Sequence, residues 1–219
     1  MKVETKRKIA SVFFPERCPY CSELVLPCEI ACDECIKDMP KEIFHKQIGG
    51  IFSVASALPY KDQYKDAILR LKFGKRKQFS YQLAKYMYLK FFGEVIFEDY
   101  DLISSVPLHK DNLKERGFNQ SELLARDLSR FINVSYTELL NKSRKNKPQH
   151  SLTGDKREKN VKGVYRCIDK NLVEGKRILL VDDIITTGFT LTECASILEK
   201  AGAKEIMCLT FAITLPKTT

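Results

Sequence analysis

Long apolar runs are missing from this sequence: none approaches the length of about 18 residues that a helix needs to cross a bilayer. Residues 1–8 carry several charges, and no apolar core of the secretion-signal type follows them. Internal repeats and low-complexity tracts are also absent. We therefore expect a cytoplasmic protein that does not insert into membranes.

Acidic residues are outnumbered, with 28 aspartates and glutamates against 37 lysines and arginines and a formal net charge of +9. This excess suits association with nucleic acid or with polyanionic small molecules such as pyrophosphate, and charge alone does not choose between them. With 219 residues and 44% hydrophobic content, the chain can bury one core and a small appendage. We expect an N-terminal module over residues 1–45 and a main domain over residues 46–219.

The sequence contains eight cysteines. In an intracellular protein, cysteines indicate metal ligation or reduced thiols rather than disulfides. Four of them form two pairs with two intervening residues each: Cys18, Cys21, Cys32 and Cys35. Two such pairs can place four thiolates around one Zn²⁺, which leaves no open position for catalysis. We predict a structural zinc ribbon that unfolds without its metal. Unliganded thiols and an iron–sulfur cluster are the alternatives, and Cys28 is a spare with no assigned role.

Three further segments have ordinary structural explanations. Residues 9–14 form an apolar patch that we expect to pack against the cysteine module. Residues 79–92 form an aromatic, amphipathic helix, which predicts core packing rather than a platform for stacked bases. The basic residues 72–77 close a preceding helix, and a role in holding phosphates is the alternative to simple capping.

The most informative stretch is residues 178–190. Four apolar residues, 178–181, predict a strand buried on both faces of a parallel sheet, and Asp182 and Asp183 follow at its carboxyl edge, where ligands of open α/β sheets bind. The turn over residues 186–190 then leads into a helical pattern, exposing backbone N–H groups and the positive end of a helix dipole. The stretch therefore predicts a phosphate cradle beside two carboxylates that can bind sugar hydroxyls or Mg²⁺.

This stretch resembles the loop that binds 5-phosphoribosyl-1-pyrophosphate (PRPP) in type I phosphoribosyltransferases. The resemblance implies that Asp182 and Asp183 hold the ribose hydroxyls, and that the 5′-phosphate lies on Thr186, Thr187, Gly188, Phe189 and Thr190. Response-regulator receivers also begin with Leu-Leu-Val-Asp-Asp, but at the start of a domain of about a hundred residues or more. A strand followed by a simple helix cap is the remaining alternative.

A second polar stretch, residues 107–120, lies between a buried-type strand at residues 101–106 and a helix at residues 121–131. Its donors are His109, Lys110, Arg116, Asn119 and Gln120. Arg116 could bind a phosphate through two parallel hydrogen bonds. Type I phosphoribosyltransferases carry their pyrophosphate loop here, and Pro-Leu-His with Arg-Gly-Phe-Asn-Gln resembles the ComF family of that superfamily. Capping of the next helix is the alternative role for these side chains.

Residues 141–162 contain eight lysines and arginines, two acids and almost no apolar side chains. Their order again resembles ComF proteins, which implies a flap that closes over PRPP or contacts nucleic acid. The residues assigned to it are Arg144, Lys147, Gln149, Lys156, Arg157, Lys159 and Asn160. A solvated, charged surface is the alternative.

The resemblance covers nearly the whole chain. It implies an α/β fold of the type I phosphoribosyltransferase kind, with helices on both faces of a parallel sheet and an N-terminal zinc ribbon. As an enzyme the protein would bind PRPP with Mg²⁺ and use Asp182, Asp183 and Arg116 in catalysis, with His109 and Lys110 on the phosphates and an unnamed acceptor. The alternative is a non-catalytic module that binds single-stranded DNA in natural competence, with a competence helicase or recombination mediator as partner.

Overall fold

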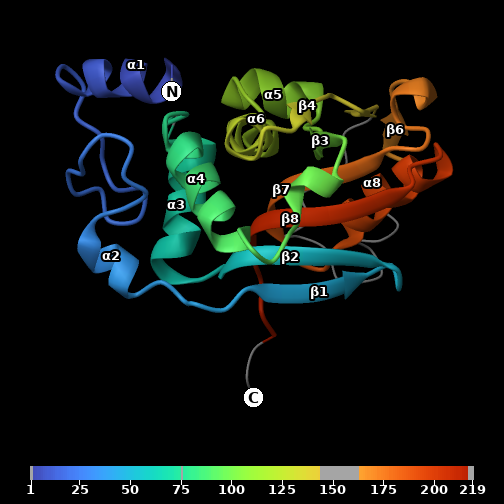
Figure 1. The fold of residues 1–219 in the computed structure, drawn as a ribbon, viewed down its shortest axis with the longest axis horizontal. Helices are drawn as coiled ribbons and strands as arrows, with labels where there is room; N and C mark the ends of the chain where they lie inside the picture. The colour runs from blue at the N-terminus through green and yellow to red at the C-terminus, as the bar shows by residue number, and fades with distance from the viewer. Residues whose placement is uncertain (1, 75, 144–162, 217–219) are drawn as a thin grey trace.

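The computed structural model describes residues 2–74, 76–143 and 163–216, and a six-stranded sheet forms its centre (Figure 1). The strand order is β1-β2-β8-β7-β3-β4, and all neighbours are parallel except β1 and β2. The strands are β1 (Phe44–Ile48), β2 (Phe52–Pro59), β3 (Leu102–Ser105), β4 (Ser135–Tyr136), β7 (Arg177–Ile185) and β8 (Glu205–Ile213). The predicted α/β fold is confirmed, and an antiparallel edge strand is added to it.

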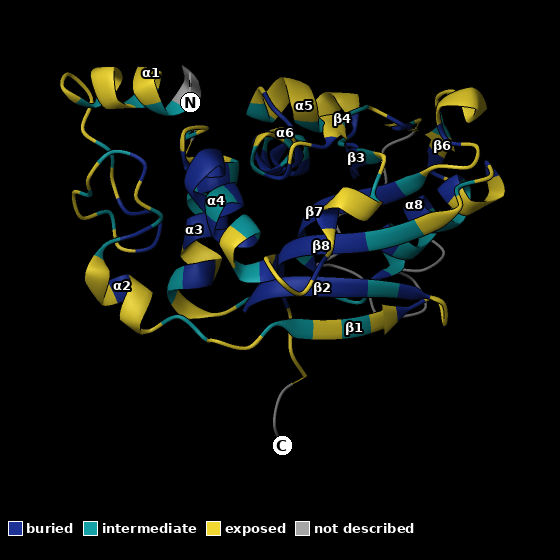
Figure 2. Cartoon of the chain, in the orientation of Figure 1, coloured by how far each residue is buried: buried dark blue, intermediate teal, exposed yellow. Residues whose placement is uncertain are grey.

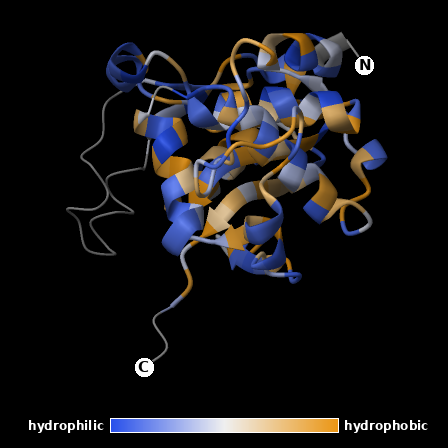
Figure 3. Ribbon diagram, turned by 90° about the vertical axis from the view of Figure 1, so that its left-hand side faces the viewer, coloured by the Kyte–Doolittle hydropathy of each residue, from blue (hydrophilic) through white to orange (hydrophobic). Residues whose placement is uncertain are grey.

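Helices cover both faces of the sheet. The helices of the described residues are α1 (Lys2–Ser11), α2 (Asp33–Lys37), α3 (Asp62–Phe73), α4 (Phe79–Phe91), α5 (Lys110–Arg116), α6 (Gln120–Ile132) and α8 (Phe189–Lys200), with short 3₁₀ turns η1 (Phe97–Asp99) and η3 (Lys170–Leu172). Of these, α4, α6 and α8 pack on the sheet. Leu179 and Val181 pack with α4 and α6, whereas Ile178 and Leu180 pack with α8. Strand β7 is therefore buried on both faces, as predicted, and Figures 2 and 3 show the buried, hydrophobic centre.

The aromatic helix α4 contributes to the core, as expected. Phe79, Tyr81, Tyr86 and Phe91 are buried, and Tyr88 stacks on Phe131 of α6 with ring centroids 5.8 Å apart. Among the described residues, no helix is both long and apolar enough to span a bilayer.

Two segments beside the sheet have a structure that the sequence patterns described above do not specify. The chain after α6 forms only the short strand β4 in the main sheet: Thr137 N–H still donates to Ile103 O of β3 at 2.9 Å, and the chain then leaves this sheet. It continues as β5 (Leu140–Lys142), which pairs with β6 (Tyr165–Cys167) in a separate antiparallel sheet. The loop expected at residues 107–120 contains the helix α5, which ends at Gly117 with a φ of 78°.

The cysteine module packs directly against α3 and α4. The Tyr20 and Tyr64 rings meet edge to face with centroids 5.9 Å apart, and Gln82 Nε2 donates to Arg17 O and Glu29 O. Cys18 and Cys35 belong to the same buried cluster as the side chains of α4. The module thus shares a core with the residues that follow it.

Helix α1 is attached through polar side chains. Arg7 Nε lies 2.9 Å from Glu16 Oε1, and Tyr81 OH donates to Glu4 Oε1 at 2.9 Å. The expectation that residues 9–14 pack against the module is wrong, because the exposed fractions of their large apolar side chains range from 64% to 80%. These apolar side chains lie at the end of α1 and in the residues that follow it, and they remain exposed.

Candidate functional site

Two neighbouring carboxylates lie inside β7, which continues past them to Ile185. Asp182 Oδ1 accepts hydrogen bonds from Ser121 Oγ at 2.7 Å and from the Asp183 N–H at 2.9 Å. Burial, and secondly the negative charge of Asp183, raises the pKa of Asp182. Two donors therefore fix the orientation of a carboxylate that takes up a proton more readily than an ordinary aspartate.

Asp183 has a cationic partner from a distant helix. Its Oδ2 lies 2.6 Å from Lys72 Nζ, although no hydrogen bond with suitable angles reaches this oxygen within the described part of the chain. The Asp183 side chain is 9% exposed and that of Lys72 is 18% exposed, so this ion pair is shielded from water. The sequence placed Lys72 among the cations that close α3, with a role in holding phosphates as the alternative; the structure places it at the carboxylates.

The turn after β7 leads into α8 without a side-chain cap. Gly188 is the N-cap residue, with a φ of 95°. A Cβ atom at Gly188 would lie 2.6 Å from Ile48 Cγ2, so glycine is required by both the backbone angle and the space. The first N–H groups of a helix have no intrahelical carbonyl partners, and they carry the positive end of the helix dipole. These groups could hold a phosphate, and the phosphate cradle at residues 186–190 stays a prediction.

Lys46 of the edge strand β1 holds the backbone of this turn. Lys46 Nζ donates to Thr186 O at 2.8 Å and to Thr187 O at 3.4 Å. The two carbonyls therefore point toward β1. Lys46 gave no signal in the sequence, because a single lysine in a short polar segment is unremarkable.

The second predicted stretch, residues 107–120, supplies caps as well as cations. His109 is 5% exposed, and its Nδ1 accepts from the Asp111 N–H at 3.2 Å at the start of α5. Asn119 caps α6 in the same way through Ser121 N–H, and its Nδ2 donates to Val106 O. The capping alternative thus holds for these two side chains. The Arg116 guanidinium lies over the Phe73 ring, 5.0 Å from its centroid, at the end of α3 that also carries Lys72.

The β5–β6 pair brings two side chains that the sequence did not indicate. Lys142 is paired in register with Tyr165, and its Nζ lies 5.2 Å from the centroid of the Tyr165 ring. Tyr165 is buried and forms a side-chain hydrogen bond with Thr190 in the first turn of α8. This pair therefore adjoins the predicted phosphate turn.

Residues 144–162 of the predicted flap, including all seven of its assigned side chains, lie outside the described residues, whereas its first two residues, Asn141 and Lys142, belong to β5. Of the other predicted residues, the two carboxylates and the turn share one strand–turn–helix unit, Arg116 is linked to it through the end of α3, and Lys110 is exposed at the start of α5. Lys46, Ser121 and Tyr165 are among the side chains that sequence reasoning did not place in this site.

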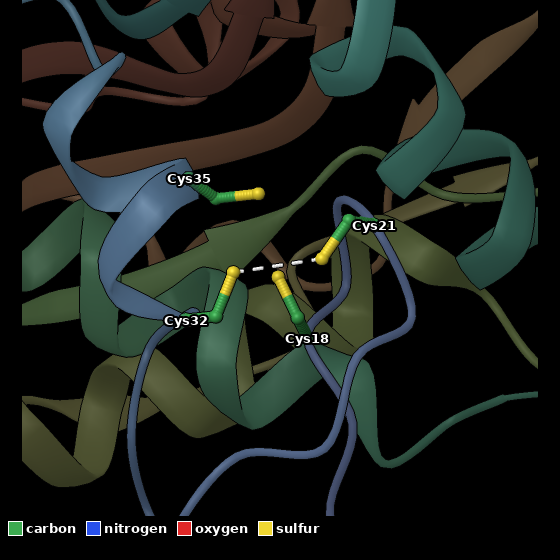
Figure 4. Close-up of side chains that lie close together, drawn as sticks. All are labelled: Cys18, Cys21, Cys32 and Cys35. Carbon is green, nitrogen blue, oxygen red and sulfur yellow. Dashed lines mark hydrogen bonds between the residues drawn. The ribbon is translucent and has the colours of Figure 1, made fainter.

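The four paired cysteines meet in space (Figure 4). The Sγ atoms of Cys18, Cys21, Cys32 and Cys35 all lie within 4.8 Å of one another, and those of Cys21 and Cys32 are 3.5 Å apart. A backbone hydrogen bond at Cys35 lowers the pKa of Cys32, whereas burial raises that of Cys35. Four sulfur ligands at such separations could hold a metal ion. Cys28 lies outside the group, and its Sγ is 3.9 Å from Glu4 O.

One family model and several solved structures match parts of this chain. A model of the phosphoribosyl transferase domain family matches residues 119–217. Among solved structures, the purine phosphoribosyltransferase of Pyrococcus horikoshii is 15% identical, with a TM-score of 0.39 over 61% of this chain and 83% of that one.

Curated relatives match most of the chain. The DNA utilization protein YhgH of Escherichia coli K12 is 29% identical over 202 residues, which cover 88% of this chain and 82% of that protein. Competence protein F of Haemophilus influenzae is 30% identical over 197 residues, covering 86% and 82% of the two chains. Competence protein ComFC of Bacillus subtilis is 32% identical over 159 residues, covering 71% and 62%. The chain thus belongs to the competence protein F, or ComF, family, and carries its phosphoribosyltransferase-type domain behind a four-cysteine module.

Proposed function

We propose that this protein binds PRPP with Mg²⁺ at the carboxyl edge of its sheet and acts in natural competence, the uptake of DNA for transformation. One observation carries the proposal: a buried pair of carboxylates and an uncapped helix terminus lie on the same strand–turn–helix unit. A ribose phosphate offers the matching groups, namely hydroxyls for the carboxylates and a phosphate for the N–H groups.

Different residues of the chain bind different groups of PRPP. The turn at residues 186–190 takes the 5′-phosphate, and Asp182 and Asp183 take the ribose hydroxyls. Arg116 and Lys110 take the pyrophosphate, and His109 caps the helix that carries them. Asp183 already forms an ion pair with Lys72, so a ribose hydroxyl would donate to a carboxylate whose charge is balanced.

The implied metal ions suit the donors that are present. Aspartate oxygens are hard ligands, and Asp182 and Asp183 would hold Mg²⁺ through water together with the ligand. Bound Mg²⁺ would supply positive charge against the pyrophosphate. Four clustered thiolates are the preferred donors of structural Zn²⁺, so we assign zinc to the cysteine module.

As an enzyme, the protein would transfer the ribose phosphate group of PRPP to an acceptor nucleophile, and pyrophosphate would leave. The acceptor could be ammonia, an amine or a base. Its contribution would be electrostatic, because fixed dipoles and charges stabilise the positive charge that develops on the ribose ring. The Ser121 hydroxyl and the Lys72 ammonium group hold the two carboxylates in place for this.

A second candidate function uses the same fold without catalysis. The net charge of +9 and relatives named for competence and DNA utilization favour binding of single-stranded DNA. A helicase or a recombination mediator would then be the protein partner. Affinity for single strands would fall steeply with salt, because counterions are released from the phosphates.

Calorimetric titration tests both functions in one sample. PRPP with Mg²⁺ is titrated into zinc-loaded protein, and single-stranded DNA follows. We expect micromolar PRPP binding by the wild type and a loss of about 100-fold or more in the Asp182→Asn/Asp183→Asn double variant, since both hydroxyl acceptors lose their charge. Asp66→Asn, which removes an exposed carboxylate of α3, is the matched control and should bind like the wild type.

The two functions give different results. Unchanged PRPP affinity in a folded double variant would remove the carboxylates from the site. If the wild type ignores PRPP but binds DNA in a salt-dependent way, the non-catalytic function replaces the enzymatic one.

A further inference from the structure

The β5–β6 pair forms an arm that is packed on the start of α8. Leu140 and Tyr165 belong to the same buried cluster as Leu191 and Cys194 of that helix. Gly163 N–H donates to Glu193 Oε1 at 2.7 Å, and Ser143 N–H donates to Val164 O at 2.9 Å across the arm. Tyr165 also forms a hydrogen bond with Thr190. The arm is therefore fixed against the helix terminus that we assign to the phosphate.

Lys142 is the basic side chain that this arm directs toward the site. Its ammonium group lies 5.2 Å from the centroid of the Tyr165 ring, and its charge interacts with those of Asp182 on β7 and Arg116 on α5. Within the described part of the chain, no carboxylate forms an ion pair with it. Lys72 provides the contrast, because its ammonium group is already matched at 2.6 Å by Asp183.

A half-buried cation without a carboxylate is costly, and the ring face of a tyrosine compensates for only part of the lost hydration. An anion that arrives with the ligand would compensate for the rest. We propose that Lys142 is a further ligand-binding residue, whose ammonium group donates to a phosphate or pyrophosphate oxygen of PRPP beside the start of α8. This inference rests on the proposed function and adds a residue to its site.

The alternative is that Lys142 serves only packing, with its methylene groups on Tyr165 and its charge directed to solvent. The two roles differ in their response to pH. Burial is the main cause that lowers the pKa of Lys142, and Arg116 adds to it, while Cys194 and Asp182 oppose it. As pH rises through this lowered pKa, the ammonium group loses its charge, and affinity for a phosphate oxygen falls. An arginine at this position keeps its charge throughout.

Other groups that face Lys142 do not produce this alkaline effect. Burial raises the pKa values of the Tyr165 hydroxyl and the Cys194 thiol, so both stay neutral at moderately alkaline pH. The pKa of Asp182 is raised as well, but its proton is lost on the acidic side of this range.

The test is calorimetry of the zinc-loaded, full-length protein with PRPP and Mg²⁺, repeated between about pH 8 and pH 10, above the range in which Asp182 titrates. Lys142→Met should weaken binding at the lower pH by about tenfold, the loss of one charge-assisted hydrogen bond. Lys142→Arg should bind well at the higher pH, where the wild type has weakened. Arg166→Met is the matched control: it removes a cation from the neighbouring, exposed position of the same arm and should bind within about twofold of the wild type.

Separate titrations with ribose 5-phosphate and with inorganic pyrophosphate locate the contact, because only the fragment that Lys142 touches should lose affinity in Lys142→Met. Thermal unfolding accompanies each titration. If the wild type binds PRPP and a folded Lys142→Met binds both fragments equally well, the role of Lys142 is overturned and the proposed function stands. If the wild type does not bind PRPP at all, both are overturned.

Discussion

The carboxyl edge of the sheet and the four-cysteine group are assembled in different ways. At the sheet edge, residues far apart in sequence already satisfy one another: Lys46 and Thr186 are 140 positions apart, and Ser121 and Asp182 are 61 positions apart. In the cysteine group, two short local segments bring together four sulfur atoms whose strongest potential partner is a metal ion. The first site is formed by the fold and needs no ligand to exist. We predict that the second needs a metal ion to hold its two short segments together.

Removal of the metal should have the largest effect on stability, and it should affect the cysteine group rather than the sheet edge. A chelator, or Cys32→Ser, should release the module from α3 and α4, because binding free energy at a structural zinc site is folding free energy. We expect near-stoichiometric zinc in the wild type, and a loss of about 3 kcal/mol or more of stability without it. Elemental analysis and thermal unfolding measure the two quantities.

Cys28→Ser is the matched control for that experiment, since Cys28 lies outside the group. It should retain the metal and most of the stability. A metal-free protein that is fully folded and melts like the zinc-loaded form would show that the module needs no ion.

Removal of the Asp182 charge should change the stability less than removal of the metal, and it should raise the stability rather than lower it. Burial and the neighbouring Asp183 charge raise its pKa to about 7, so the folded state holds a proton that the unfolded state releases near the ordinary pKa of 3.8. Stability contributed by this group is therefore lost as pH rises from about 4 to about 7. Asp182→Asn keeps the acceptor for Ser121 and removes the charge.

We expect Asp182→Asn to be more stable than the wild type by about 2 kcal/mol above neutral pH and equally stable near pH 4. Denaturant unfolding at both pH values measures this. A variant that is less stable than the wild type at alkaline pH would show that the ion-pair network at Lys72 outweighs the burial of the charge.

The smallest of the three effects concerns Lys46, which orients the turn rather than touching the ligand. Lys46→Met removes two hydrogen bonds to the carbonyls of Thr186 and Thr187, and we expect PRPP affinity to fall about fivefold with little change in stability. Lys61→Met, at an exposed position before α3, is the control. Equal affinity of all three proteins would mean that the turn is held by Gly188 and Ile48 alone.

Local patterns in the sequence predicted the parts of the fold that are local in structure. Strand β7, its turn and α8 occupy consecutive residues, so one stretch reveals all three. Strand β1 was missed because its central residues, His45, Lys46 and Gln47, are polar and give no apolar signal. Helix α5 was missed because it has only seven residues and depends on the cap from His109.

The candidate site was predictable to the same extent. Its carboxylates and phosphate turn follow from one motif, whereas their partners do not. Lys46, Lys72 and Ser121 come from three other elements, and only the strand order β1-β2-β8-β7-β3 and the packing of α3 and α6 bring them to β7. Side chains that gain a role through tertiary contacts carry no signature of their own.

The two edges of the main sheet have a consequence for how molecules of this protein meet. An exposed edge strand offers free backbone groups to a strand of another molecule and so promotes aggregation. Here one edge is β1, whose exposed positions carry polar side chains, and the other is β4, with only two residues. Neither is a good template for strand addition, so we expect that the main sheet does not continue from one molecule into another.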